Sequence, residues 1–548
     1  MVTALVALGT AQLVAAVLAA PASAPVDAVG AVSINHTPEA VKNFAISAFG
    51  SNDKTVLVWG IRVVLLVFAV VIGVLALRKL WLGMAGLAVF AAIGVAAALA
   101  QSGASAAYAL PTLLGAGVAA LALRYFRKLA SPGVERTLAP RRPPGAAVGQ
   151  SGPALAGPSS PDSGPAVPVS GPVWRPVRPD PAARGGAGYG PDRRKFLTAS
   201  AAAAAGSLVA YGGGSFLASS RNVSIAQRAI RLPKPAVPAP PLPAGADLRI
   251  PGLSSFITPN ASFYRVDTAL ILPEIAPAQW QLRVHGMVRH ELMLSFDDLI
   301  KRPLTEDYIT LCCVSNPVSG PYIGNAKWLG ASLRSLLEEA GVHAGASQLL
   351  CTSSDGFTSG TPVATAMDGR DALVAVAMNN APLPVAHGFP VRLVIPGLYG
   401  YVSACKWIVD IEVTTYGSAQ AYWVPRGWSA QAPVKTESRI DVPTGQNPLT
   451  VGKRATIAGV AWAQHKGIEA VEVRVGNGPW QQATLAAVPD IDTWRQWVYE
   501  WDVNVEPGSY LIEARATDKT GYTQTSLAEP PPPNGASGYP SVQVSVVR

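Results

Sequence analysis

The chain has 548 residues, which is too long for one ordinary domain and predicts at least two soluble domains with additional segments. Only 14% of the residues are charged and the mean hydropathy is +0.27, values typical of a chain with membrane spans. Many of the cations behind the net charge of +9 stand between apolar runs, so we expect no nucleic-acid partner. The four cysteines form no CxxC pair, which argues against a disulfide framework and against structural zinc.

Residues 1–128 are predicted to form four transmembrane helices. Each apolar run is close to the roughly 20 residues that cross a bilayer, and the runs lie at about 4–20, 56–77, 80–99 and 106–124. The first run has a rival interpretation as a cleaved signal peptide, because Ala-Pro-Ala-Ser-Ala24 is similar to a cleavage site. It has no basic n-region, which favours a retained span.

The distribution of cations predicts the orientation of these helices. Basic residues stand at 78–79 and after 124, whereas the loops 21–54 and 100–105 carry few of them. The positive-inside rule therefore places the N-terminus and the segment after 124 in the cytoplasm. None of the histidines lies within a span, so haem held by two axial histidines is not expected and the helices are predicted to be anchors.

Three further segments lead to the soluble part. Residues 129–192 are rich in Pro, Gly, Ala and Ser and are predicted to be a disordered cytoplasmic linker. Within 193–218, Arg-Arg-Lys-Phe-Leu precedes an Ala-rich run and resembles an internal twin-arginine export signal. The alternative is a pair of stop-transfer arginines beside a fifth transmembrane helix. Both interpretations place the chain after 218 outside the cytoplasm, where the Pro-rich segment 219–248 is predicted to be a tether.

Local signals in residues 249–443 predict an α+β domain. Trp280, Leu282 and Val284 alternate as in a strand, and Ser295-Phe-Asp-Asp298 is a capping box that begins a short helix. The spacing of Leu333, Leu336, Leu337 and Ala340 predicts a second helix that ends at Gly341.

A cysteine stands at the end of an apolar, strand-like run in Thr310-Leu-Cys-Cys-Val-Ser-Asn316, where the chain is expected to turn sharply before the next helix. A thiolate at such a turn can bind a soft or high-valent metal. Four other segments carry polar residues that suit an anionic cofactor, and they are 258–267, 351–356, 387–392 and 397–407. In this order, and most specifically at His387-Gly-Phe-Pro-Val-Arg392, these segments resemble the sulfite oxidase family of molybdenum oxidoreductases.

This resemblance implies a molybdenum ion held by one molybdopterin and by the thiolate of Cys313, which is the metal ligand and the catalytic residue. Cys312 is its buried neighbour. The residues that the resemblance assigns to the pterin are Asn260, Tyr264, Arg265, Ser354, Asp355, His387, Arg392, Ser403 and Lys406. Taken singly, each of these residues has an ordinary structural interpretation, such as a buried cysteine or a core histidine. Their order and spacing favour the cofactor site.

The chemistry of a pyranopterin phosphate suits these residue types. The phosphate is a dianion that binds fixed cations and directional donors, and Arg392 offers a planar fork while Lys406 offers a point charge. His387 and Asn260 offer directional hydrogen bonds. Apolar residues alternate on both sides of Arg392, which places the arginine on the opposite strand face from them.

Residues 444–548 read as regular short strands, with hairpin-turn chemistry at Gly476-Asn-Gly-Pro479. Such a pattern over about 100 residues predicts an immunoglobulin-like β-sandwich. The aromatic residues of the segment 494–501 are predicted to be core or interface residues. The region resembles the dimerisation domain of sulfite oxidases, so the resemblance implies a homodimer.

The sequence therefore predicts a multi-pass cell-membrane protein whose catalytic domain faces the extracytoplasmic side. It is expected to transfer an oxygen atom on a small, sulfur-containing substrate and to exchange electrons with a separate partner. Pro259, Pro317 and Val318 stand where sulfite oxidases carry arginines, so sulfite is one possible substrate and sulfoxides are another. The alternative is a non-catalytic, membrane-anchored surface module, against which the intact Cys313 and Arg392 argue.

Overall fold

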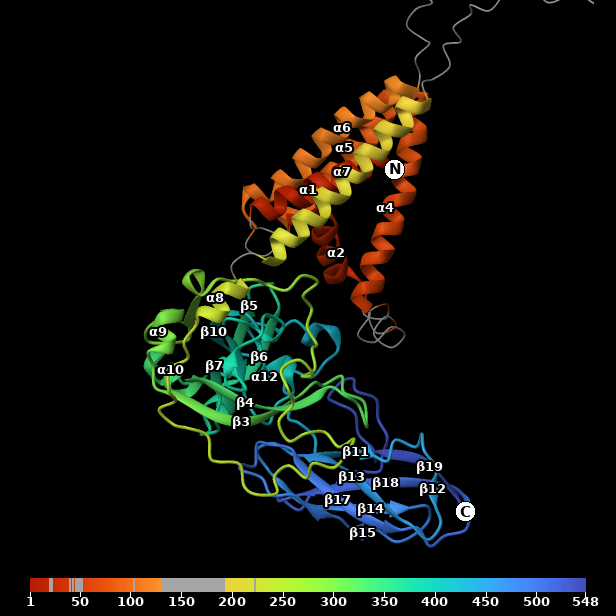
Figure 1. Ribbon diagram of the computed structural model, residues 1–548. Coiled ribbons are helices and arrows are strands. Elements are labelled where there is room, and N and C mark those ends of the chain that lie inside the picture. Colours follow the sequence, from red (N-terminus) through yellow and green to blue (C-terminus); the bar gives the residue numbers. More distant parts are fainter. Residues whose placement is uncertain are drawn as a thin grey trace, which may run out of the picture.

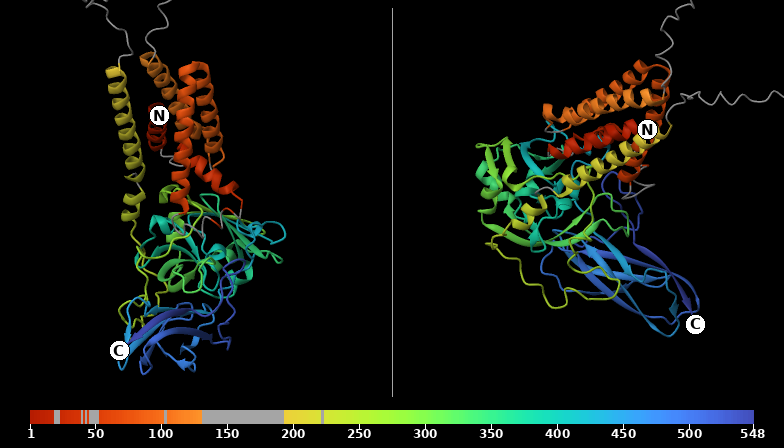
Figure 2. Two further views of the ribbon diagram at one scale, coloured as in Figure 1. Left: turned by 90° about the vertical axis from the view of Figure 1, so that its right-hand side faces the viewer. Right: turned by 45° about the horizontal axis from the view of Figure 1, so that its top comes forward.

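The computed structural model describes residues 1–18, 23–38, 41, 44, 53–101, 104–130, 193–220 and 223–548. A helical bundle, an α+β domain and a β-rich domain follow one another along its length (Figure 1). The views in Figure 2 place the helices on one side of the α+β domain and the β-rich domain on the other. Most of the predicted linker, from 131 to 192, and part of the predicted cleavage site, at 20–22, lie outside the described residues.

Four helical segments of the described chain are long and apolar enough to cross a membrane, and they are Val56–Arg78, Leu80–Leu99, Ala106–Leu129 and Arg194–Ser215. They match three of the predicted runs and the predicted fifth span. The first predicted run forms the 16-residue apolar helix α1 (Val2–Val17), which is shorter than these four segments, and its crossing of the membrane stays a prediction. The helices of the bundle are α1, α2 (Pro25–His36), α4 (Asp53–Arg78), α5 (Leu80–Leu99), η3 (Ala106–Ala109), α6 (Leu110–Ala130) and α7 (Arg193–Ser220).

Small residues hold α1 inside the bundle, where it packs against α6 and α7. A Cβ atom on Gly9 of α1 would lie 2.6 Å from the carbonyl oxygen of Ser207 on α7. A Cβ atom on Gly115 of α6 would lie 2.6 Å from the carbonyl oxygen of Ala7. Glycine therefore lets the backbones of these apolar helices approach closely, a type of contact that is also common between membrane helices.

The α+β domain contains two mixed or antiparallel sheets. The first has the order β2-β1-β10-β5-β6, with bounds Leu292–Ser295, Gln281–Gly286, Ile408–Thr414, Gln348–Ser353 and Thr358–Pro362. The second has the order β3-β4-β7-β8, and β9 also pairs with β7. Its bounds are Leu304–Cys312, Ile323–Ser332, Leu373–Met378, Ala381–Pro382 and, for β9, Arg392–Val394. Short helices precede the first strand or connect later ones, and they are α8 (Val223–Ala229), η5 (Pro277–Gln279), α9 (Phe296–Ile300), α10 (Leu333–Ala340), α11 (Val363–Met367), η6 (Val385–His387), α12 (Gly400–Ser403) and η7 (Val424–Arg426).

Several local predictions are confirmed. The Ser295 side chain accepts from the backbone N–H of Asp298, whose carboxylate accepts from Ser295 in turn, so the capping box begins α9. Helix α10 ends at Gly341, whose φ of 71° is left-handed. Helix α10 is the next helix after the turn at Cys313, as expected, but a strand that was not predicted lies between them. Strand β4 comes first and pairs antiparallel with β3, because the apolar residues on both faces of this hairpin are buried.

The C-terminal domain consists of two sheets with the orders β11-β13-β17-β16 and β12-β19-β18-β14-β15. The bounds are β11 (Glu437–Val442), β12 (Leu449–Thr450), β13 (Arg454–Trp462), β14 (Ile468–Val475), β15 (Gln481–Gln482), β16 (Thr484–Leu485), β17 (Arg495–Asp502), β18 (Gly508–Asp518) and β19 (Ser541–Val547). Side chains from both sheets, including Trp497 and Ile512, form one core. The predicted turn at Gly476 joins β14 to β15, and β11 lies before the expected boundary at 444.

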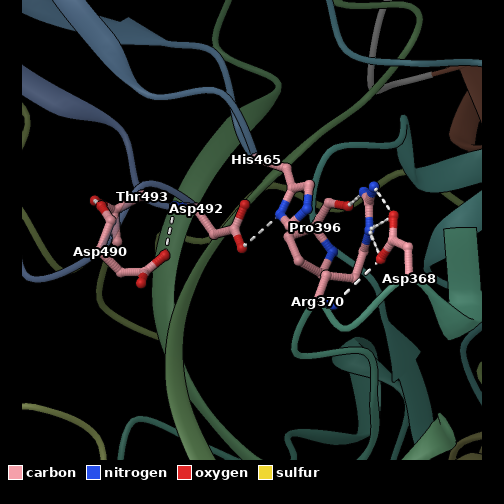
Figure 3. Close-up of polar contacts among 7 residues, drawn as sticks. All are labelled: Asp368, Arg370, Pro396, His465, Asp490, Asp492 and Thr493. Atoms are coloured by element: carbon pink, nitrogen blue, oxygen red, sulfur yellow. Dashed lines mark hydrogen bonds and ion pairs between the residues drawn. The ribbon is translucent and has the colours of Figure 1, made fainter. Parts of the chain in front are cut away.

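The two soluble domains share a buried polar interface beside strand β3. The indole N–H of Trp494 donates to the carbonyl of Phe256 (2.9 Å), and the backbone N–H of Trp494 donates to the Thr310 hydroxyl (2.7 Å). Figure 3 shows a neighbouring part of this interface, where His465 and Asp492 of the C-terminal domain lie beside the Arg370–Asp368 ion pair. The strand that leads to Cys313 is therefore fixed by both domains.

Candidate functional site

Cys313 stands at the start of the loop between β3 and β4. Its backbone N–H donates to the carbonyl of Tyr322 (2.9 Å), and the N–H of Asn316 donates to the carbonyl of Cys313 (3.1 Å). The side-chain oxygen of Asn316 accepts from the N–H of Tyr322 (2.8 Å), so this asparagine closes the loop. A Cβ atom on Gly320 would lie 2.5 Å from that oxygen, which explains the glycine. The Cys-x-x-Asn spacing therefore places Asn316 where it can close the loop that begins at Cys313.

The Cys313 side chain is 8% exposed, and its sulfur lies 2.9 Å from the Ser315 hydroxyl. Burial raises the pKa of the Cys313 thiol, while the hydrogen bonds of Ser315 and the charge of Lys406 oppose this rise. The thiol of the protein alone is therefore protonated at neutral pH. A bound metal cation supplies the positive charge that converts such a thiol into a thiolate ligand.

Arg392 lies on β9 with 4% of its surface exposed. Its guanidinium donates to the carbonyls of His387 (3.1 Å) and Ala404 (3.4 Å) and stacks over the Trp328 ring at 5.0 Å. Burial lowers the pKa of Arg392 to about 10, so the group remains cationic at neutral pH. The two carbonyls fix the direction of the fork, as expected for a preorganised anion-binding group.

His387 and Asn260 meet in the structure, because the ring Nε2 of His387 lies 3.2 Å from the Asn260 carbonyl oxygen. Burial and the charges of Arg392 and Lys406 lower the pKa of His387 to about 4, so its imidazole is neutral at pH 7. The Asn260 amide donates to the carbonyl of Met378 (3.2 Å) and accepts from the side chain of Asn379 (2.7 Å). Asn379, which the sequence analysis did not single out, therefore orients Asn260.

The neutral state of His387 predicts a pH dependence of stability. Its pKa is about 4 in the folded protein and 6.5 in the unfolded chain, so the unfolded chain binds the extra proton first on acidification. The stabilisation is complete above pH 6.5 and is lost as the pH falls towards 4, by up to about 3 kcal/mol. The variant His387→Gln should show a smaller loss, measured by urea unfolding at pH 7 and pH 4.5. Equal losses in both proteins would contradict the assignment.

Lys406 and Arg265 share one carboxylate, that of Asp267. The Lys406 ammonium lies 2.7 Å and the Arg265 guanidinium 2.8 Å from the same Asp267 oxygen. Burial lowers the pKa of Lys406 to about 8, against the opposing charge of Asp267. The backbones of Arg392 and Lys406 form an antiparallel bridge, which brings these cations together. Asp267 was missed by the sequence analysis, although it ends the segment 258–267 that contains Asn260.

The other predicted residues surround this cluster in different ways. Tyr264 stacks on Phe263, with ring centroids 5.2 Å apart, and its hydroxyl would lie 3.7 Å from a Cβ atom on Gly400. The N–H of Ser354 donates to the carbonyl of Trp407 (2.9 Å), which places the loop of Ser354 and Asp355 beside Lys406. The Asp355 carboxylate accepts from the N–H of Phe357 within its own loop (3.1 Å).

Ser403 is oriented differently from the cationic side chains. Its hydroxyl donates to the carbonyls of Leu398 (2.9 Å) and Tyr399 (3.1 Å), and its side chain is fully buried. The hydroxyl is thus already used to hold the turn into α12. The structure brings the backbone around Ser403 to the cluster, because the adjacent Ala404 carbonyl accepts from Arg392.

The donor set of this site fits a metal bound to an anionic organic chelator. Arg265, Arg392 and Lys406 provide three cationic side chains against the single carboxylate of Asp267, so the cluster has room for a dianion. The Asn316 amide nitrogen, next to the cysteine loop, is buried and has no hydrogen-bond partner among the described residues. A buried donor of this kind requires an acceptor, which a ligand beside Cys313 can provide.

Comparison with known proteins gives one family. The profile described as "Oxidoreductase molybdopterin binding domain" matches residues 269–423. This range includes Cys313, His387, Arg392 and Lys406 but begins after Asn260, Tyr264 and Arg265.

Three relatives extend the match. Mitochondrial sulfite oxidase of Mus musculus is 30% identical over 328 residues, which are 50% of this chain and 58% of the relative, so the chain spans little more than half of that protein. Sulfite oxidase of Gallus gallus is 30% identical over 322 residues, which are 50% of this chain and 69% of the relative. The uncharacterized oxidoreductase YuiH of Bacillus subtilis is 32% identical over 150 residues, which are 27% of this chain and 72% of the relative.

Proposed function

Because this chain belongs to the sulfite oxidase family of molybdopterin-dependent oxidoreductases, we propose that it is a membrane-anchored enzyme that transfers an oxygen atom on a small, sulfur-containing substrate. The observation that carries this proposal is the position of Cys313, in a closed hairpin loop beside a buried cationic cluster. When bound, the molybdenum–molybdopterin cofactor supplies a two-electron centre for oxygen-atom transfer.

The residues of the chain have separate tasks in this proposal. Cys313 provides the thiolate ligand, and the buried residues beside it, Val314 and Asn316, limit access of water to the metal position. Arg392 and Lys406 hold the phosphate of the cofactor, with Arg265 at the exposed edge. His387 offers a neutral hydrogen bond to the pterin, and Asn260 and Tyr264 complete that wall. Ser354, Asp355 and Ser403 position the loops that carry these groups.

The proposed substrate is an uncharged sulfur compound such as a sulfoxide, with sulfite as the second candidate. Pro259 is an exposed residue within the pterin segment, and Pro317 is an exposed residue within the cysteine loop. They and Val318 replace arginines that the family's sulfite-oxidising members use to bind a dianion. The nearby Arg439 is engaged, because it pairs with Asp441 at 2.6 Å and donates to the Gly320 carbonyl (3.0 Å). Cationic binding of the substrate is therefore reduced on this side.

The remaining assignments are also proposals. The apolar helices and the distribution of cations support a multi-pass cell-membrane protein with its catalytic domain on the extracytoplasmic side. The internal Arg193-Arg194 pair begins α7 and is proposed to act as a twin-arginine signal. The two sheets with one shared core support an immunoglobulin-like sandwich, and the resemblance supports homodimerisation through it. A separate partner exchanges electrons with the metal.

A metal analysis followed by a substrate screen tests the proposed function. The full chain, purified from molybdate-replete cells, should contain about one molybdenum and one pterin per chain. It should then turn over a sulfoxide or sulfite, but not both equally, with a dye as electron donor or acceptor. The alternative, a non-catalytic surface module, predicts neither molybdenum nor pterin in the same preparation. That result would overturn the proposal.

A further inference from the structure

We propose that the apolar cavity between helices α1, α2, α4, α5 and α6 binds a membrane quinone, whose carbonyl oxygen accepts a hydrogen bond from Thr112. This inference deepens the proposed function, on which it rests, by naming the chemical class of the electron partner. The cavity lies in the helical bundle, apart from the cofactor site described above.

The cavity has a volume of about 190 Å³ and is lined almost entirely by apolar side chains from five helices. Representative lining residues are Ala11 of α1, Val29 of α2, Leu65 of α4 and Phe90 of α5. A cavity of this size is large enough for a ring-sized apolar group, since engineered apolar cavities of about 150 Å³ bind benzene. The walls therefore select an apolar molecule dissolved in the membrane.

Thr112 of α6 is the lining residue that indicates a polar head on this molecule. It is 5% exposed, and its hydroxyl has no hydrogen-bond partner among the described residues. Thr112 stands in the first turn of α6, directly after the 3₁₀ turn η3 (Ala106–Ala109), and its hydroxyl forms no hydrogen bond to that preceding turn in the described part of the chain. A buried hydroxyl without a partner costs about 1–3 kcal/mol. A ligand carbonyl removes that cost, whereas a hydrocarbon chain does not.

Charged residues adjoin the walls of the cavity. Asp27 of α2 follows the lining residue Val26, and Arg62 of α4 follows the lining residue Ile61. The two charges attract each other, and Arg62 also donates to the hydroxyl of Tyr211 on α7 (3.3 Å). Ionisable residues inside a membrane bundle usually mark a functional site. A quinone uses such groups, because its reduction takes up protons.

Helix α2, which forms part of the cavity wall, also contacts the cofactor domain. A Cβ atom on Gly30 of α2 would lie 2.5 Å from a terminal methyl of Leu270, and α2 lies at the end of the bundle nearest that domain (Figure 1).

The exchange of electrons between the substrate and the quinone balances without another reactant. The substrate sulfur gains the oxygen atom of one water, and the quinone takes the two electrons and two protons to become a quinol. The reverse exchange consumes a quinol and releases water.

Binding measurements on the full chain in lipid nanodiscs test this proposal. The probes are a naphthoquinone with a two-isoprene tail and the matching alkylnaphthalene, which has the same apolar body but no carbonyl. We expect Thr112→Val to weaken binding of the naphthoquinone by about 3- to 10-fold, the effect of one hydrogen bond. Thr112→Ser should retain wild-type affinity. Thr198→Val is the matched control, since its hydroxyl on α7 already bonds to the Arg194 carbonyl (2.8 Å).

A second variant, Ala116→Leu, fills the cavity and should prevent binding of both probes. Equal affinity of the wild-type protein for the two probes, with no effect of Thr112→Val, would show a lipid-filled cavity and overturn the proposal. Absence of naphthoquinone binding would overturn it as well. The binding is measured without turnover, on preparations with and without molybdenum. A failure of the enzymatic assignment therefore appears as missing metal, and a failure of the quinone site as missing binding.

Discussion

Replacement of Cys313 by serine is expected to reduce turnover on the order of 10²- to 10³-fold without unfolding the protein. Loss of a residue that only orients a metal ligand typically costs 10- to 100-fold, so loss of the ligand itself should cost more. Serine has nearly the same volume but no soft sulfur, and the backbone bonds of the loop, from Cys313 to Tyr322 and from Asn316 to Cys313, do not depend on the side chain. The fold should therefore survive the loss of the ligand.

The adjacent cysteine provides the matched control. Cys312 is buried more deeply than Cys313, at 1% exposed, and its thiol lies 3.5 Å from the Cys313 carbonyl oxygen. Cys312→Ser should keep most of the activity and the wild-type metal content. Turnover, bound molybdenum, the sulfur-to-metal absorption band and the circular dichroism spectrum would be measured for both variants. Wild-type turnover in Cys313→Ser, or equal losses in the two variants, would contradict the assignment of the ligand.

Replacement of Trp494 by alanine is expected to lower the free energy of unfolding by about 3–5 kcal/mol, the usual range for a buried tryptophan. The side chain is 2% exposed and belongs to the core cluster of the α+β domain, although it stands beside β17 of the C-terminal domain. Its indole N–H donates to Phe256 (2.9 Å) across the domain interface. The substitution removes this contact and leaves a cavity, so the two domains should also lose their common unfolding transition.

Trp480 serves as the control for this prediction. It is half-buried, and its ring contacts Tyr539, Arg474 and Arg515 of its own domain. Trp480→Ala should therefore cause a much smaller loss and leave one cooperative transition. Calorimetry of the full chain should show two separated unfolding transitions for Trp494→Ala, one for the α+β domain and one for the C-terminal domain. A single transition close to that of the wild type would mean that Trp494 does not join the domains.

Local structure was predictable wherever neighbouring residues decide it. The capping box at Ser295, the left-handed stop at Gly341 and the strand around Leu282 each depend on residues within one turn or a few positions of one another. The long apolar helices from 56 to 124 depend on continuous apolar composition. Strand β4 was missed because a run buried on both faces has no alternation that distinguishes a strand from a buried helix.

Prediction of the site was limited in a similar way. The cysteine loop, His387 and Arg392 belong to short segments whose residue order is informative. The shared carboxylate of Asp267, the orientation of Asn260 by Asn379 and the inward hydroxyl of Ser403 depend on which distant segments meet. No spacing within a single segment encodes these contacts.

The sequence by itself determined the apolar spans, the order of the domains and the residue types that suit a thiolate-bound metal and an anionic cofactor. Only the tertiary structure decided that α1 packs inside the bundle, that Asp267 lies between two cations and that β3 is fixed by both soluble domains. The physical reason is distance along the chain. Composition and short-range periodicity act over a few residues, whereas burial, pKa shifts and ion pairing at a site arise from segments that folding brings together.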